Sequence, residues 1–120
     1  MRSRFAAFAV GDVEYLWRTL HPDHHDRALP KHDVLRALRA ASQNLKYMRL
    51  QILDEAGERI LFRASVFEKG QDRSFVELSL FAHDGMGWRY LEGESRDPRA
   101  LSEPGALTIE SFLALGASPP

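Results

Sequence analysis

Apolar and polar residues follow a helical pattern in the first 44 positions of the chain. Phe5, Phe8 and Ala9 are spaced as on one face of a helix, and Gly11-Asp12 combines a helix-ending glycine with an N-cap residue. From Val13 the apolar residues recur at i, i+3, i+4 and i+7, as on a second amphipathic helix. The residues that follow are polar and include two prolines, which predicts a loop. The pattern therefore predicts helices near residues 5–9, 13–20 and 33–44, with a loop over 21–33.

The period changes from helical to alternating after residue 45. Short glycine-containing turns separate apolar-rich segments typical of strands. Consecutive strands joined by short turns form an antiparallel meander, and the preceding helices must cover one of its faces. We therefore predict an α+β domain in which N-terminal helices pack on a four-stranded antiparallel sheet. The predicted strands span residues 46–53, 59–67, 73–83 and 87–92, and the predicted domain, 1–95, is followed by a Pro-containing tail, 96–120.

The third predicted strand has no fully polar face. Val76, Leu78 and Leu80 share one side, and Glu77 and Ser79 lie on the other with two phenylalanines. Three short helices can cover only one face of the sheet, so something else must cover the second. We expect a second copy of the chain there, in a homodimer formed through Val76, Leu78 and Leu80. The alternative is that the tail folds back over this face, although its composition predicts a poorly ordered or partner-dependent segment with one short helix.

Composition narrows the class of protein. The 120 residues carry 16 basic and 17 acidic side chains, five histidines and no cysteine, so disulfides, cysteine-ligated zinc and thiolate chemistry are excluded for them. A net charge of −1 argues against a nucleic-acid partner, and no apolar run reaches the roughly 20 residues of a membrane helix. No phosphate-binding glycine loop, dinucleotide fingerprint or G-x-S-x-G elbow is present. We expect a single cytoplasmic domain with neither a nucleic-acid nor a membrane partner.

Residues 21–26 gather histidines and aspartates, the ligand types that many divalent metals prefer. They lie in a predicted loop that must lose conformational entropy before it coordinates an ion, and they lack the spacing of a helical metal motif. The first histidine has a simpler role near a helix C-terminus, where its protonated form meets the negative end of the helix dipole. We therefore predict no metal and no cofactor. The cluster consists of His21, Asp23, His24, His25 and Asp26.

Glu77 is a candidate for chemistry because a carboxylate within an apolar strand must be hydrogen-bonded, paired, or near water in a cavity. Arg63 on the neighbouring strand is its expected partner. A desolvated carboxylate can serve as a general acid or base, whereas a salt-bridged glutamate on a half-exposed sheet is the purely structural alternative. Four aromatic residues either line an apolar ligand pocket or fill the core: Trp17, Phe81, Trp88 and Tyr90.

Six short motifs occur in a fixed order along the chain. They are Met1-Arg2-Ser3-Arg4-Phe5-x-x-Phe8, Gly11-Asp12-x-x-Tyr15-Leu16, Thr19-x-His21-Pro22, Phe62-x-Ala64, Glu77-x-Ser79-x-Phe81 and Trp88-x-Tyr90-x-x-Gly93. This series resembles the middle domain of the bacterial-type YchJ family, and the resemblance covers residues 1–95. It implies a nuclear-transport-factor-2-like (NTF2-like) fold, in which a curved antiparallel sheet wraps around helices. The resulting cone often holds a ligand or an active site.

The chain departs from this family in two respects. The resemblance implies flanking SEC-C segments, which are cysteine-rich zinc-binding motifs, and a family without a firmly established activity. The absence of cysteine means that either the protein starts upstream of Met1 or it is a stand-alone version without the zinc module. Family members also often carry arginine at the positions of Leu78 and Leu80. This face is therefore unusually apolar here, which favours a dimer or partner surface.

We predict a non-catalytic module that binds a small apolar or aromatic molecule, or a protein, through a cone-shaped pocket. The enzyme alternative is a small acid–base isomerase or dehydratase in the same cone, with Glu77 or His21 as base and Tyr90 as proton donor. A third interpretation is an adaptor that uses the apolar outer face of the sheet and the tail helix near Phe112. The residues predicted to border the pocket are Trp17, His21, Arg63, Glu77, Ser79, Trp88 and Tyr90.

Overall fold

The computed structural model describes residues 1–101 and 104–115. Its helices come first: α1 (Arg2–Val10), α2 (Val13–Arg18), the 3-10 helix η1 (His25–Ala28) and α3 (Lys31–Asn44). α1 ends at Gly11, whose φ of 78° is the left-handed conformation that glycine adopts without strain. The carboxylate of Asp12 accepts the backbone N–H of Tyr15 at 3.1 Å and caps α2. The three predicted helices are confirmed, although α3 begins slightly earlier than predicted and η1 occupies part of the predicted loop.

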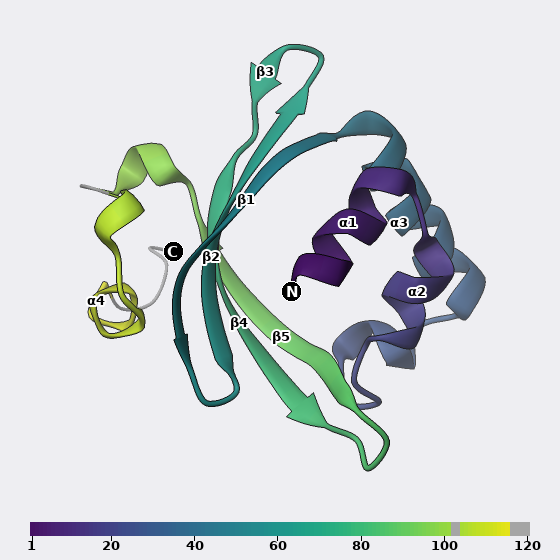
Figure 1. Ribbon diagram of the computed structural model, residues 1–120. Coiled ribbons are helices and arrows are strands. Elements are labelled where there is room, and N and C mark those ends of the chain that lie inside the picture. The colour runs from purple at the N-terminus through teal and green to yellow at the C-terminus, as the bar shows by residue number, and fades with distance from the viewer. Residues whose placement is uncertain (102–103, 116–120) are drawn as a thin grey trace.

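One curved antiparallel sheet follows the helices (Figure 1). Its main strands run in the order β1-β2-β4-β5, which confirms the predicted meander, and the unpredicted strand β3 pairs with β2. Register shifts within the β1–β2 and β4–β5 pairs mark bulges, which bend and twist a sheet. The strands are β1 (Lys46–Ala56), β2 (Arg59–Glu68), β3 (Gln71–Asp72), β4 (Phe75–His83) and β5 (Trp88–Arg96).

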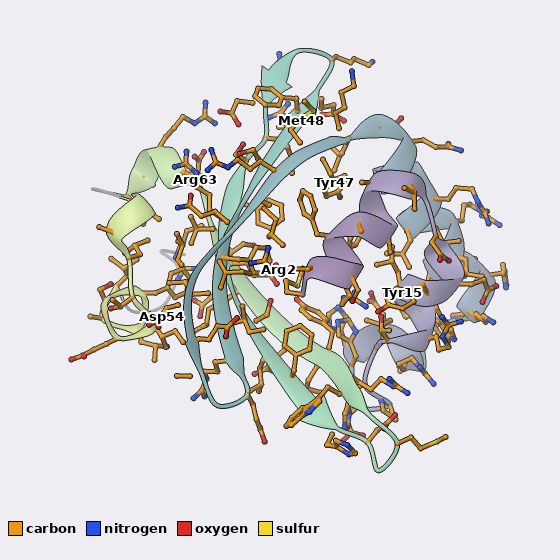
Figure 2. The ribbon with its side chains drawn as sticks, viewed as in Figure 1. Arg2, Tyr15, Tyr47, Met48, Asp54 and Arg63 are labelled. Atoms are coloured by element: carbon orange, nitrogen blue, oxygen red, sulfur yellow. The ribbon has the colours of Figure 1, made fainter. Side chains whose placement is uncertain are left out.

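The helices lie on the concave side of the sheet (Figure 1). Phe62, Ala64 and Val66 alternate along β2 and are buried on this side against residues of α1 and β1. The ring of Phe5 meets the ring of Tyr47 edge-on, with 5.7 Å between centroids. Figure 2 shows Tyr47 pointing from β1 towards α1. The prediction that the N-terminal helices cover one face of the sheet is therefore confirmed.

The tail covers the convex side of the sheet, opposite to α1–α3 (Figure 1). It forms η2 (Pro98–Ala100), η3 (Pro104–Ala106) and α4 (Ile109–Leu113). The carboxylate of Asp54 on β1 accepts the backbone N–H of Ile109 at 2.8 Å and ties α4 to the sheet. The buried residues of this second core are Leu61, Val76, Leu78, Leu107, Ile109 and Phe112.

This arrangement matches the alternative in which the tail folds back over the sheet. The expectation of a poorly ordered tail is wrong for residues 107–113, because Leu107, Ile109 and Phe112 are buried against β2 and β4. Homodimerisation through Val76, Leu78 and Leu80 stays a prediction, although the tail already buries the first two side chains. The predicted tail positions 102–103 and 116–120 lie outside the described residues. Within the described part of the chain, no helix is long and apolar enough to cross a membrane.

Candidate functional site

Two cavities lie between the helices and the concave face of the sheet. The inner cavity has a volume of about 200 Å³ and the outer cavity about 330 Å³. Met1 and Arg4 line both cavities, so α1 forms their shared wall. The outer cavity includes Tyr15, Thr19, Glu58, Phe81 and Trp88 in its wall. The inner cavity is mainly aromatic, with Phe5, Phe8, Tyr47, Phe62, Phe75 and Tyr90, and its other polar residues are His24, Asp26 and Glu77.

A hydrogen-bonded group of three side chains forms one wall of the inner cavity. Ser79 donates its hydroxyl to Glu77 Oε2 at 2.5 Å, and Tyr90 donates its phenol to the same oxygen at 2.9 Å. Burial, followed by the charge of Glu77, raises the pKa of Tyr90. The phenol therefore stays protonated at neutral pH and acts as a donor. The Glu77 carboxylate thus keeps one oxygen engaged by hydroxyl groups within an aromatic cavity.

The register of β4 and β5 explains how these side chains meet. Ser79 pairs with Gly93, and Phe81 pairs with Tyr90, with a register shift between the two pairs. A Cβ atom added at Gly93 would overlap the Tyr90 hydroxyl and the Glu77 carboxylate. The missing side chain therefore leaves the space in which Tyr90 reaches back along the sheet to Glu77.

Arg4 is a buried cation in the wall shared by both cavities, and only 6% of its surface is exposed. Its Nη1 donates to the carbonyl of Leu16 at 3.0 Å and to the hydroxyl of Thr19 at 2.5 Å. The guanidinium lies 4.8 Å from the centroid of the Tyr90 ring, a cation–π distance. Burial lowers the pKa of Arg4, and the neighbouring Tyr90 and Glu77 act in the opposite direction.

His24 closes the inner cavity from the side of η1, with 7% of its surface exposed. Its Nδ1 accepts the backbone N–H of Asp26 at 3.0 Å, and its ring is 5.5 Å from that of Tyr90. Burial, together with the neighbouring His25, lowers the pKa of His24. The neutral imidazole therefore carries its proton on Nε2.

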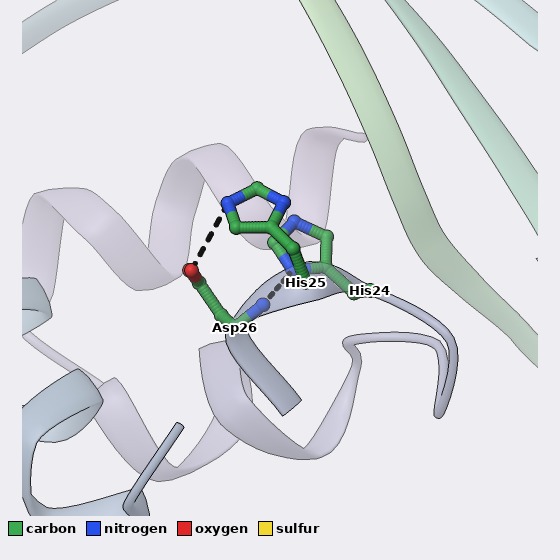
Figure 3. A group of neighbouring side chains, drawn as sticks. All are labelled: His24, His25 and Asp26. Atoms are coloured by element: carbon green, nitrogen blue, oxygen red, sulfur yellow. Dashed lines mark hydrogen bonds and ion pairs between the residues drawn. The ribbon is translucent and has the colours of Figure 1, made fainter. Parts of the chain in front are cut away.

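Three of the five residues in the predicted histidine and aspartate cluster come together at η1 (Figure 3). His24, His25 and Asp26 offer ligand atoms within 4.8 Å of one another. The dashed lines in Figure 3 mark contacts that already use two ring nitrogens: His24 Nδ1 with the Asp26 amide, and His25 Nε2 with the Asp26 carboxylate at 3.1 Å. His21 instead accepts the backbone N–H of Asp23 through Nδ1 at 3.0 Å.

The structure brings together only some of the residues predicted to border the pocket. Glu77 and Tyr90 line the inner cavity, with Ser79 hydrogen-bonded to Glu77. Trp88 lines the outer cavity, although 57% of its surface is exposed. Trp17 instead packs beneath Arg27, whose guanidinium lies 4.8 Å from the centre of the indole. His21 lines neither of these two cavities and contacts Tyr90 through its backbone, whose N–H donates to the carbonyl of Tyr90 at 2.7 Å.

The predicted pairing of Glu77 with Arg63 is wrong. Glu77 pairs with Phe62 across the β2–β4 ladder, and Arg63 pairs with Val76. Paired residues point to the same side of a sheet, so Arg63 faces the convex side. Figure 2 shows Arg63 and Asp54 on the side of the tail. Arg63 therefore does not border the cone.

Arg4, His24 and Tyr47 are residues of the inner cavity that sequence analysis missed. Arg4 lies one helical turn before Phe8, so its place on the inward face of α1 was detectable from spacing. An arginine on a helix is usually solvated, which hid this signal. His24 was assigned to a polar loop, and nothing in its spacing shows that η1 turns its ring inward.

Helices that precede a curved antiparallel sheet and pack on its concave face, with cavities between them, define an NTF2-like domain. Comparison with protein families agrees: the family model described as YchJ, middle NTF2-like domain, matches residues 1–93. The chain therefore belongs to the YchJ family. No solved structure matches it.

Curated relatives carry the name UPF0225. A UPF0225 protein of Deinococcus radiodurans is 34% identical over 93 residues, which are 77% of this chain and 64% of the relative. A UPF0225 protein of Bordetella pertussis is 29% identical over 101 residues, covering 80% of this chain and 69% of the relative. One from Enterobacter is 30% identical over 94 residues, covering 78% and 62%. The matched region thus spans about two thirds of the length of these relatives, and their names assign no activity.

Proposed function

We propose that this domain binds a small, mostly apolar or aromatic molecule in the inner cavity, with Glu77 as the polar anchor. The observation that carries the proposal is the Glu77–Ser79–Tyr90 hydrogen-bonded group in a wall made mainly of aromatic and aliphatic side chains. Pockets for small molecules combine apolar walls with a few placed polar groups, as here. Glu77 Oε1 accepts no hydrogen bond from the described residues, so it is available to a donor on the ligand.

The size of the cavity limits the ligand. Drug-sized molecules occupy pockets of about 300–1,000 Å³, and the inner cavity has about 200 Å³. The ligand is therefore a compact molecule such as a single ring or a short chain. A longer ligand extends past Arg4 into the outer cavity, because Arg4 lines both.

A second candidate function is acid–base catalysis in the same cavity, which the Glu77–Tyr90 hydrogen bond of 2.9 Å favours. A carboxylate can abstract a proton from a bound substrate, and a protonated phenol can donate one. His21 does not line the cavity, so Glu77 carries the role of base in this alternative. Once a ligand is known, an assay for its chemical conversion by the wild type and by Glu77→Gln tests this second function.

The test is a thermal-shift screen of the 120-residue protein against small organic molecules, with Glu77→Gln beside the wild type. Glu92→Gln is the matched control, because Glu92 is exposed on β5 and pairs with Leu80. A ligand at 100 times its Kd adds about 2.7 kcal/mol, which raises Tm by several degrees. We expect a shift that Glu92→Gln keeps and Glu77→Gln loses. A ligand that stabilises all three proteins equally contradicts a role for Glu77.

The cytoplasmic location and the homodimer belong to the proposal as well. Light scattering of the purified protein measures the oligomeric state. A protein that is monomeric in solution would contradict the homodimer and its interface through the sheet face.

A further inference from the structure

Two opposite charges in the inner cavity are held apart. Arg4 forms no ion pair with a described carboxylate, and Glu77 forms none with a described cation. Both nevertheless contact the same residue: Arg4 lies over the ring of Tyr90 at 4.8 Å, and Glu77 accepts its hydroxyl at 2.9 Å. The two groups therefore flank one side chain without meeting.

Each charge also keeps hydrogen-bonding capacity. A guanidinium has five N–H donors, and in Arg4 only Nη1 is used by described residues, on Leu16 and Thr19. Nε is buried without a partner, which is costly for a charged group. Glu77 retains Oε1 as an acceptor. Nε is too deeply buried to meet a ligand, so the donor that Arg4 offers to the cavity is Nη2, and the acceptor is Glu77 Oε1.

We infer that the ligand carries a neutral polar head with an acceptor and a donor side by side, of the carboxamide or cyclic amide class, which bridges Arg4 and Glu77. The inference rests on the proposed function and specifies the ligand of that site. The carbonyl oxygen accepts from the Arg4 guanidinium, and the N–H donates to Glu77 Oε1. The apolar body lies among the rings of the cavity, such as Phe62 and Phe75.

A neutral head fits the charges better than an ion. Among the side chains that line the inner cavity, one arginine and two carboxylates, those of Glu77 and Asp26, are charged, while burial lowers the pKa of His24 and favours its neutral form. An anionic head meets the repulsion of Glu77, and a cationic head meets that of Arg4. An acceptor and donor pair satisfies both groups without adding charge.

The test compares four probes of similar shape on the wild-type protein by protein-observed NMR titration: benzamide, N,N-dimethylbenzamide, benzoate and benzylamine. Dimethylation removes the donor, benzoate adds negative charge, and benzylamine lacks the acceptor. We expect benzamide to bind at least about tenfold more tightly than each of the others, because each of them leaves a charged group unsatisfied. The Nε–Hε signal of Arg4 should shift with benzamide.

Two variants assign the effect to residues. Arg4→Lys and Glu77→Gln should each lower the affinity for benzamide about tenfold, whereas Arg2→Lys, on the exposed side of α1, should not. Tighter binding of benzoate, or equal binding of benzamide and its dimethyl analogue, overturns the inference but leaves the cavity as a binding site. If none of the four probes binds and no molecule in the thermal-shift screen raises Tm, the proposed function itself is wrong. The comparison of probes needs no variant, so it stands even where Arg4→Lys fails to fold.

Discussion

Gly93→Ala tests the geometry that brings Tyr90 and Glu77 together. At an ordinary strand position, alanine in place of glycine stabilises a protein by about 0.4–1 kcal/mol, because it restricts the unfolded chain. At Gly93 the new methyl group would occupy the place of the Tyr90 hydroxyl and the Glu77 carboxylate. The variant must therefore displace both side chains and break their hydrogen bond.

The magnitude follows from that bond. A hydrogen bond to a charged group contributes about 1.5–3 kcal/mol, and the entropic gain offsets part of its loss. We expect Gly93→Ala to lower the free energy of unfolding by about 1–2 kcal/mol. The assay is urea denaturation followed by tryptophan fluorescence, with linear extrapolation to water.

Two controls make the measurement specific. Gly87→Ala meets only the flexible end of Arg89, so its effect should stay within about 0.5 kcal/mol. In a Tyr90→Phe background the hydroxyl is already absent, so Gly93→Ala should cost about 1 kcal/mol less than in the wild type, a coupling measured by the double-mutant cycle. A neutral or stabilising Gly93→Ala refutes the proposed packing of the site.

Two further predictions concern the tail and pH. Phe112→Ala should lower the free energy of unfolding by about 3–5 kcal/mol, because its ring is only 2% exposed in the core on the convex side. Leu113→Ala, at an exposed position, should lower it by less than about 1 kcal/mol. Equal effects of the two variants in urea denaturation would show that the tail does not pack as described. His24 has a pKa below its usual 6.5 in the folded state, so the unfolded chain takes up the proton first and stability should fall as pH drops through 6.5. A His24→Gln variant should lose that part of the slope, while the exposed control His32→Gln should retain it.

Period and turn chemistry were sufficient to predict the helices, the meander and the two faces of the sheet. Register was not predictable, because alternation shows which residues share a face within a strand but not which residues face each other across strands. The expected Glu77–Arg63 pair failed for this reason, since Phe62 and not Arg63 lies opposite Glu77.

Packing between residues far apart in the sequence was the second feature that could not be predicted from the sequence. Arg4 is charged, so its burial follows only from the closure of α2 and β5 around it, through Leu16, Thr19 and Tyr90. The tail illustrates the same limit, because α4 has only five residues and gains its stability from the sheet beneath it.

A crystal structure of the protein with the ligand that gives the largest thermal shift tests the central claim most directly. The ligand should lie in the inner cavity, with its polar head between Arg4 and Glu77 and its apolar part against the surrounding rings. A ligand bound instead on the convex face near Arg63 would contradict the assignment of the cone as the functional site.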